Sequence, residues 1–333
     1  MYYRQVFSYL AVAILLFGAG WYTHGRYYGC SKPRKDRRVV LQGFRFTSPL
    51  LDVELPEGVV IGDEPNPFKY KIKEFIQRQI DAGQVRKVAV YYRDLHDGPW
   101  FGIDEKTEFN PASMMKVPVM IAWLKRAERD PGVLMRTFVY DGRKNMSATQ
   151  NIAPDRTITP GRRYTVEELL RYMMNYSDNN ATSLLYEGLS VAELNAVMDS
   201  MDVNNNPNDD NNSISVHGYS GFFRILYNAS YLSREMSEKA LALLSLQDFP
   251  EGIAAGVPKG IPVAAKFGEV AQGRYGGDRQ LHEFGIVYHP AHPYILGIMT
   301  EGNDFARQKE ILGNISRMIY TEVDSTIVKD DRR

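Results

Sequence analysis

Cysteine is almost missing from this chain of 333 residues, where Cys30 is the only one. A single cysteine excludes an intrachain disulfide framework and any metal site built from several cysteines. Histidine is also scarce, with six residues. His289 and His292 form an H-x-x-H, but a proline follows each of them, which is typical of a turn between two apolar runs. We therefore expect no metal site there and no cofactor.

An excess of charge of either sign is missing as well. The 40 lysines and arginines balance the 40 aspartates and glutamates, so the formal net charge is zero. This balance gives no reason to expect a nucleic-acid partner. The hydrophobic share of 44% is ordinary for a globular protein, and the length suits one large domain plus a tail.

Only one apolar run, Val6 to Trp21, reaches the length of a membrane span, and aromatic residues flank it. No small-residue cleavage site follows this run, so we expect residues 1–30 to form an uncleaved membrane anchor. Residues 31–66 are basic at first and then bear proline and glycine without sustained periodicity, which predicts a linker.

The charges around this anchor do not favour export of the body. Arg4 precedes the apolar run, whereas six basic residues follow it between Arg26 and Arg38. The positive-inside rule, taken alone, would leave the rest of the chain in the cytoplasm. The expected location therefore depends on the chemistry of the body.

Residues 67–333 carry the periodicity of a folded domain. Apolar residues recur at helical spacing from Phe68 to Ile80, and Asp97-Gly98 separates two strand-like runs, 87–93 and 100–103. Further helices are expected at 165–174, 180–189, 191–201, 219–232, 235–246 and 304–320, and further strands at 263–267, 283–289 and 294–300. This order predicts an α+β fold with about five antiparallel strands flanked by helices, and an all-helical subdomain inserted between the halves of the sheet.

The stretch from Phe109 to Lys125 holds the first chemical signal. Ser113 and Lys116 lie three positions apart in the first turn of an expected helix, after Pro111 and before an apolar run. That spacing puts both side chains on one helix face. A lysine whose amine is partly desolvated can act as the base of a serine nucleophile. Because S-x-x-K alone is common, its weight depends on what lies downstream.

Two more segments could join this pair. Ser177 and Asn179 lie in a Ser-Asp-Asn that follows an expected helix, where they offer a hydroxyl for proton relay and an amide for a substrate carbonyl or a neighbouring lysine. Ser-Asp-Asn is equally typical of an ordinary helix end, because these residues favour turns. Lys266 and Gly268 lie in a Lys-Phe-Gly that ends a strand-like run, where the lysine could place positive charge at the edge of a cleft.

Together, S-x-x-K, S-D-N and K-x-G in this order resemble the motifs of the penicillin-recognising serine hydrolases, most nearly those of class A β-lactamases. The resemblance covers about residues 67–322. It implies the β-lactamase/transpeptidase-like fold, with the first motif at a helix start, the second in the helical part and the third on a late strand. It also implies that family's substrates, which are β-lactams and cell-wall peptides.

The resemblance assigns the acyl-transfer chemistry to a few of these residues. Ser113 would be the acylated nucleophile, and Lys116 would be its general base or proton relay. Ser177 would pass a proton to the leaving nitrogen. The backbone N–H groups of Ser113 and Glu269 would form an oxyanion hole, in which one donor can be worth about 3 to 4 kcal/mol.

The same resemblance assigns substrate binding to Asn179, Lys266 and Gly268. Asn179 would hold a side-chain amide of the substrate, and Lys266 would supply positive charge for its carboxylate. This chain departs from the family pattern at Phe267, where threonine or serine is usual. We expect the missing hydroxyl to remove a charge-assisted hydrogen bond worth about 1.5 to 3 kcal/mol, and the ring to add bulk beside the carboxylate.

The base for deacylation is the second departure. Class A enzymes carry a glutamate in an E-x-x-L-N motif on an omega loop. Residues 193–195 resemble the end of that motif, but Val191 holds the position of its glutamate, so we interpret the match as a coincidence. The region where the motif is expected has no such glutamate, and no spacing selects among Asp209, Asp210 and His217 as a substitute.

Three functions remain open. The first is a membrane-anchored, monomeric serine hydrolase that forms an acyl-enzyme on β-lactams or cell-wall peptide amides and deacylates slowly. The second is a ligand-binding protein on the same fold that acylates poorly or not at all, which Phe267 and the missing glutamate favour. The third is a D,D-peptidase or transpeptidase, which needs no omega-loop glutamate. Because peptidoglycan lies outside the cytoplasm, we expect an extracytoplasmic body despite the charges around its anchor.

Overall fold

The computed structural model describes residues 44–47, 67–96, 98–201, 213–271 and 278–330. The expected membrane anchor at 1–30 and most of the expected linker lie outside these residues. Among the described helices, none is both long enough and apolar enough to cross a membrane.

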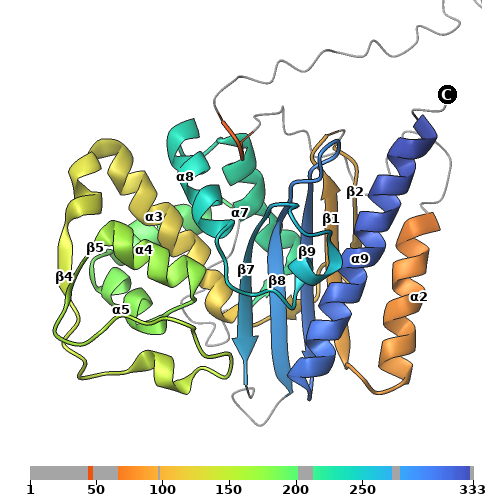
Figure 1. Ribbon diagram of the computed structural model, residues 1–333, viewed down its shortest axis with the longest axis horizontal. Helices are drawn as coiled ribbons and strands as arrows, with labels where there is room; N and C mark the ends of the chain where they lie inside the picture. The colour runs from red at the N-terminus through yellow and green to blue at the C-terminus, as the bar shows by residue number, and fades with distance from the viewer. Residues whose placement is uncertain (1–43, 48–66, 97, 202–212, 272–277, 331–333) are drawn as a thin grey trace, which may run out of the picture. The chain divides into compact units, whose positions relative to one another are not determined.

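A central sheet of five antiparallel strands, in the order β2-β1-β9-β8-β7, organises the domain (Figure 1). The strands are β1 (Lys87–Asp94), β2 (Trp100–Ile103), β7 (Val263–Val270), β8 (Arg279–Val287) and β9 (Tyr294–Gly302). Early and late strands meet where β1 pairs with β9 along its full length. The structure thus confirms the predicted sheet, and it leaves β7 as an edge strand.

Alternation along β1 explains how the sheet carries helices on both faces. Val88 and Val90 lie in one buried cluster with residues of α2 (Pro67–Asp81) and α9 (Phe305–Asp330). Ala89 and Tyr91 lie in a second cluster, which belongs to the helical part of the chain. Figure 1 shows α2 and α9 on one side of the sheet and the helical part on the other. The helices of that part are α3 (Lys116–Arg129), α4 (Val166–Asn175), α5 (Asn179–Glu187), α6 (Val191–Asp199), α7 (Val216–Asn228) and α8 (Arg234–Leu244).

Short strands and 3₁₀ turns connect these elements. Two small sheets pair β3 (Glu108–Phe109) with β6 (Ile214–Ser215), and β4 (Thr137–Val139) with β5 (Arg163–Thr165). The 3₁₀ turns are η1 (Ala112–Met115), η2 (Pro131–Met135), η3 (Met146–Thr149) and η4 (Ile253–Gly256).

Capping residues explain where two helices of the helical part begin. Thr165 accepts a hydrogen bond from Glu168 N–H, and the Glu168 carboxylate accepts one from Thr165 N–H, so α4 starts with the predicted capping box. Ser190 and Glu193 form the same reciprocal pair at the start of α6. Both boxes satisfy N–H groups that have no partner within the helix.

Two elements begin earlier than the apolar pattern predicts. Strand β8 begins at Arg279 rather than at 283, because Gln280 and His282 are polar but find hydrogen-bond partners inside the fold. Helix α7 begins at Val216 rather than at 219, because the Ser215 side chain caps it by accepting from Gly218 N–H.

Part of the expected linker is attached to the body. The carboxylate of Glu238, on α8, accepts hydrogen bonds from the consecutive N–H groups of Arg45, Phe46 and Thr47 at 2.6 to 3.0 Å. The Phe46 ring is buried against Tyr288, with ring centroids 5.1 Å apart. Residues 44–47 therefore dock on the domain, which the lack of periodicity in this segment does not predict.

Candidate functional site

Ser113 lies on the 3₁₀ turn η1, which leads directly into α3. The α-helix begins only at Lys116, so Ser113 precedes it rather than lying in its first turn as expected. Residues i and i+3 eclipse in a 3₁₀ helix, so Ser113 and Lys116 still share one face. The turn begins from Ala112, whose φ of 49° is a left-handed conformation, and the Asn110 side chain accepts from Ala112 N–H at 2.9 Å.

The amine of Lys116 joins the first two sequence motifs. Its Nζ lies 2.6 Å from the backbone oxygen of Ser177, 3.0 Å from Ser177 Oγ and 2.7 Å from Asn179 Oδ1. The Lys116 side chain is buried, so these three oxygen atoms replace the water that an ammonium group would otherwise bind. Asn179 holds the lysine, which is one of the two uses that its amide suggests.

Burial lowers the pKa of Lys116 from 10.5 to about 7, although the negative charges of Asp178 and Glu269 oppose this change. A neutral amine has two N–H donors and one lone pair. It can donate to Ser177 O and Asn179 Oδ1, and its lone pair can accept from the Ser177 hydroxyl. In that state Lys116 is able to act as a base at neutral pH.

Lys266, on β7, brings the third motif to the same hydroxyl. Its Nζ lies 3.0 Å from Ser177 Oγ and 3.0 Å from the backbone oxygen of Phe267, and its side chain is fully buried. Burial lowers the pKa of Lys266, and the charge of Lys116 lowers it further, because both amines face one oxygen atom. Ser177 Oγ is therefore shared by two lysines, an arrangement through which a proton can be relayed.

Ser177 is held in a left-handed backbone conformation, with a φ of 56°. The next residue, Asp178, is fully buried and caps α5 by accepting from Asn180 N–H at 2.8 Å. Its carboxylate also accepts from Ser147 Oγ at 2.7 Å and from Ile158 N–H at 2.8 Å. These bonds fix the backbone on the C-terminal side of Ser177 and maintain its strained conformation.

The backbone of β7 presents an N–H group at its free edge, the edge that no strand pairs with. Phe267 N–H donates to Gln247 Oε1 at 2.7 Å instead of to β8. The N–H groups of an antiparallel strand alternate between its two edges, so Glu269 N–H points to the same free edge as Phe267 N–H. This direction agrees with the backbone role expected for Glu269.

Gly268 lets this free edge approach the nucleophile turn closely. A Cβ atom at residue 268 would lie 2.5 Å from the backbone oxygen of Pro111 and 3.1 Å from Met114 N. The glycine of K-x-G is therefore required for packing against η1. Within the described part of the chain, neither Ser113 N–H nor Glu269 N–H has a hydrogen-bond acceptor, so both are available to an oxyanion.

Phe267 does not add bulk to the site, contrary to expectation. Its ring is buried in the cluster that contains α9 and stacks on Phe249, with ring centroids 4.4 Å apart. Successive side chains of a strand point to opposite faces, so the side chain that follows Lys266 turns away from Ser177. What remains of the predicted departure is the missing hydroxyl.

The Glu269 side chain makes contacts that the sequence does not predict. Its carboxylate accepts from Asn151 N–H at 2.8 Å, Asn151 Nδ2 at 3.0 Å and Ile152 N–H at 3.2 Å. The neighbouring Gln150 binds the other side of the site, since its Nε2 donates to Ser177 O at 3.1 Å and its Oε1 accepts from Asn179 N–H at 3.3 Å. We call residues 150–152 the crossing segment.

The structure assigns packing or capping contacts to two of the residues considered for deacylation. Glu193, in the segment interpreted as a coincidental match, forms an ion pair with Arg126 as well as its capping box. His217 packs its ring against Tyr91 and Trp100, with centroids 5.9 and 5.4 Å away. Asp209 and Asp210 lie outside the described residues.

Two buried polar side chains behind the site were missed by the sequence reasoning. His282 Nδ1 accepts from Thr300 N–H, so Nε2 carries the proton and donates to the backbone oxygen of Asn110, next to the nucleophile turn. Glu283 accepts from Ile253 N–H at 2.5 Å and from Gln247 Nε2 at 2.8 Å. A glutamate inside an apolar strand was a usable signal for the second, whereas nothing in the sequence singles out the first.

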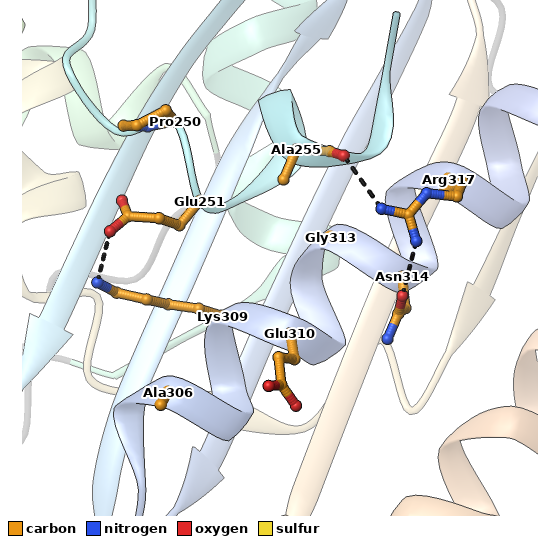
Figure 2. Close-up of a pocket in the computed structure, with 9 residues that line it drawn as sticks. All are labelled: Pro250, Glu251, Ala255, Ala306, Lys309, Glu310, Gly313, Asn314 and Arg317. Atoms are coloured by element: carbon orange, nitrogen blue, oxygen red, sulfur yellow. Dashed lines mark hydrogen bonds and ion pairs between the residues drawn. The ribbon is translucent and has the colours of Figure 1, made fainter.

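A surface hollow lies far from this chemistry, between α9 and the 250–257 segment (Figure 2). Figure 2 shows Lys309 paired with Glu251, and Arg317 reaching both the backbone oxygen of Ala255 and Asn314. Helix α9 packs on the face of the sheet opposite α3, so this hollow is not part of the site. Within the described ranges, no group of three or more His, Cys, Asp or Glu side chains could hold a metal ion.

Comparison with protein families gives one match that spans most of the chain. The family model described as the β-lactamase enzyme family matches residues 69–323. This range contains all the motif residues of the site. It also agrees with the extent of the resemblance seen in the sequence.

Solved structures show the same fold. PBP-A, also known as an acyl-enzyme complex with penicillin G, superposes with a TM-score of 0.65 at 22% identity, covering 80% of this chain and all of that one. A β-lactamase from Sphaerobacter thermophilus gives 0.64 at 20% identity, covering 74% of this chain and 94% of its own. A class A β-lactamase from Mycobacterium abscessus gives 0.64 at 21% identity, covering 76% and 99%. At these identities the likeness establishes the fold alone.

One curated relative matches a shorter stretch. The β-lactamase regulatory protein BlaB of Streptomyces cacaoi is 32% identical over 105 residues, which is 28% of this chain. The chain spans 30% of the length of that relative.

Proposed function

This chain belongs to the β-lactamase enzyme family, and from that premise we propose that it is a serine acyltransferase-type hydrolase whose nucleophile is Ser113. Ser113 Oγ would attack the carbonyl carbon of a β-lactam or a cell-wall peptide amide. The observation that carries the proposal is the pair of buried lysines, Lys116 and Lys266, which share the hydroxyl of Ser177.

The acylation step uses this network in both directions. Lys116 Nζ would take the proton of Ser113 as the bond from Oγ to the carbonyl carbon forms. The N–H groups of Ser113 and Glu269 would stabilise the negative charge on the carbonyl oxygen. When the carbon–nitrogen bond breaks, Ser177 would give its proton to the leaving nitrogen and recover one from Lys116. The products of the step are an ester at Ser113 and a free amine.

We propose that the ester is hydrolysed slowly. The sequence between the S-D-N motif and β7 has no glutamate at the spacing of the omega-loop motif of class A enzymes. Without a base to activate water, hydrolysis of the ester would lose the factor of about 10² to 10⁴ that general base catalysis contributes. A long-lived acyl-enzyme is the expected consequence.

A time course with penicillin G tests the proposal. Intact-mass measurements on the wild-type body should show one covalent penicilloyl adduct, and Ser113→Ala should show none. A wild-type adduct that persists for many minutes after removal of free penicillin supports slow hydrolysis. Rapid turnover with no accumulated adduct would contradict slow hydrolysis, and no adduct with no turnover would contradict acylation.

A ligand-binding role is the second candidate. The missing omega-loop glutamate favours it, and so does the match over 105 residues to a protein described as a β-lactamase regulator. In that case a bound β-lactam would be a signal rather than a substrate. Binding without a covalent adduct, measured by calorimetry on wild type and on Ser113→Ala, would distinguish this role because both proteins would bind equally well.

We further propose that residues 6–21 anchor the body on the extracytoplasmic side of a membrane. The support is the apolar run itself and the location of the proposed peptide substrate. Protease treatment of intact cells that express the full chain tests this. Digestion of the body without lysis is expected, and protection until lysis would contradict the orientation.

A further inference from the structure

The crossing segment joins the two sides of the candidate site. Gln150 is bonded to Ser177 and Asn179, and Asn151 and Ile152 are bonded to the Glu269 carboxylate. The two sets of contacts belong to different parts of the fold, the loop before α5 and the edge strand β7. Three consecutive residues therefore tie together the elements that carry the second and third motifs.

The path of this segment is set by the faces of β7. Lys266 reaches Ser177 from one face, whereas the Phe267 ring lies in the cluster on the opposite face. Ile152 packs against that same cluster. Because β8 occupies the other edge of β7, the segment passes around the free edge on its way from Ser177 to Ile152.

The free edge is the part of β7 that an extended ligand would use. A peptide-like chain can add to an unpaired strand edge through main-chain hydrogen bonds. The N–H of Glu269, assigned above to the oxyanion, also points to this edge. The crossing segment and an extended acyl group would therefore compete for one place.

Glu269 is what holds the segment there. Its two carboxylate oxygens accept three N–H groups, and charge-assisted hydrogen bonds of this kind are stronger than neutral ones. Asn151 is exposed and Ile152 only partly buried, so few other contacts oppose opening of this part of the segment. A single side chain thus controls whether the edge is covered.

We propose that Glu269 is a specificity-determining residue of the reaction at Ser113, because its carboxylate holds residues 150–152 over the free edge of β7. An acyl donor with an extended side chain must displace the segment, whereas a donor without one needs no such displacement. This inference rests on the proposed function. It predicts that loss of the Glu269 side chain opens the site selectively to extended donors.

Acylation rates of Glu269→Ala test the proposal with two probes, a fluorescent penicillin that has a long side chain and 6-aminopenicillanic acid, which has none. The second-order rate constant should rise about tenfold for the first probe and change less than twofold for the second, because the variant no longer loses the closed fraction of molecules. Glu269→Gln, which keeps an oxygen for the two backbone N–H groups, should lie between the two proteins.

The measurements belong at pH 8.5, because the Glu269 charge raises the pKa of Lys116 and its loss would otherwise alter the base. Glu251→Ala is the matched control, since Glu251 also forms a partly exposed contact, to Lys309, but on the other face of the sheet (Figure 2). That control should acylate like wild type with both probes. An unchanged or lower rate for the fluorescent penicillin in Glu269→Ala, or an equal gain for both probes, would overturn the proposal.

Hydrogen exchange separates this inference from the proposed function. Without any ligand, the amides of Asn151 and Ile152 should exchange at least about tenfold faster in Glu269→Ala than in wild type. Equal exchange in the two proteins would overturn the inference whatever happens at Ser113. If the exchange rises but no protein forms an adduct, the clamp exists and the acyl-transfer function is wrong.

Discussion

Lys116 Nζ lies 3.0 Å from Ser177 Oγ, which joins a candidate base to the hydroxyl that would face a leaving group. The amine is buried, and its pKa falls to about 7 for that reason. Neither residue has unusual chemistry by itself. Their contact in a place that water does not fill is what makes a lysine usable as a base near neutral pH.

The pH dependence of acylation follows from this contact. A base must be unprotonated, so the second-order rate constant for a fluorescent penicillin should rise with pH and level off above about 7. Lys116→Met should acylate at least about 10² times more slowly and lose this dependence. Stopped-flow fluorescence between pH 5.5 and 9 measures both, and a flat wild-type profile would show that Lys116 is not the base.

Restoring the family's hydroxyl at residue 267 should not improve the enzyme. Phe267 is buried and stacked on Phe249, so Phe267→Thr removes a core ring and should lower the free energy of unfolding by about 3 kcal/mol. Because the side chain points away from Ser177, penicillin affinity should not increase. Urea unfolding and the acylation rate test the two parts, and a stable variant with a faster reaction would contradict the assigned side-chain direction.

A methyl group at residue 268 should impair acylation through packing. The new Cβ of Gly268→Ala would lie 2.5 Å from the backbone oxygen of Pro111, so β7 and the nucleophile turn must move apart. We expect a loss of at least about tenfold in the acylation rate, because an oxyanion donor shifts with the strand. Gly218→Ala is a control, since its nearest neighbour atom would be 3.4 Å away. Equal rates in both variants would refute this role of Gly268.

Glu283 should make the stability of the fold depend on pH. Burial raises the pKa of Glu283 from 4.5 to about 7. The folded protein then binds a proton that the unfolded chain has released, so this stabilisation is complete below about pH 4.5 and is lost as the pH rises through about 7. Relative to Glu283→Gln, wild type should lose about 3 kcal/mol of unfolding free energy between pH 4.5 and 8.

Urea unfolding at several pH values measures this difference. Glu310→Gln is the control, because Glu310 forms an exposed ion pair with Arg307 and its substitution should shift all pH values alike. A difference between wild type and Glu283→Gln that stays constant with pH would mean that Glu283 titrates normally. It would also remove the reason to regard the β7–β8 region as electrostatically strained.

Much of the fold can be predicted from local sequence patterns, because amphipathic helices and apolar strands carry their own periodicity. The β1–β2 hairpin, the capping box at Thr165 and the late strands all follow from such patterns. The start of β8 does not, since the polar residue His282 is satisfied only by Asn110 and Thr300 from distant segments. A pattern rule treats such a residue as a loop signal.

The motif residues of the site can be predicted, whereas their supports cannot. Ser177 and Lys266 are separated by a long stretch of chain, and only the order of the motifs suggests that they meet. Gln150 and the Glu269 carboxylate have no motif of their own, because their partners are mostly backbone groups that any sequence provides. The direction of the Phe267 ring is also a property of strand geometry that the motif comparison ignores.

The central claim is that Ser113 is the acylated residue, and peptide mapping tests it most directly. The body is incubated with a fluorescent penicillin at pH 8, digested, and the labelled peptide is sequenced by mass spectrometry. A single adduct on Ser113 in wild type, and none in Ser113→Ala, is the predicted result. An adduct on another residue, or equal labelling of Ser113→Ala, would contradict the account.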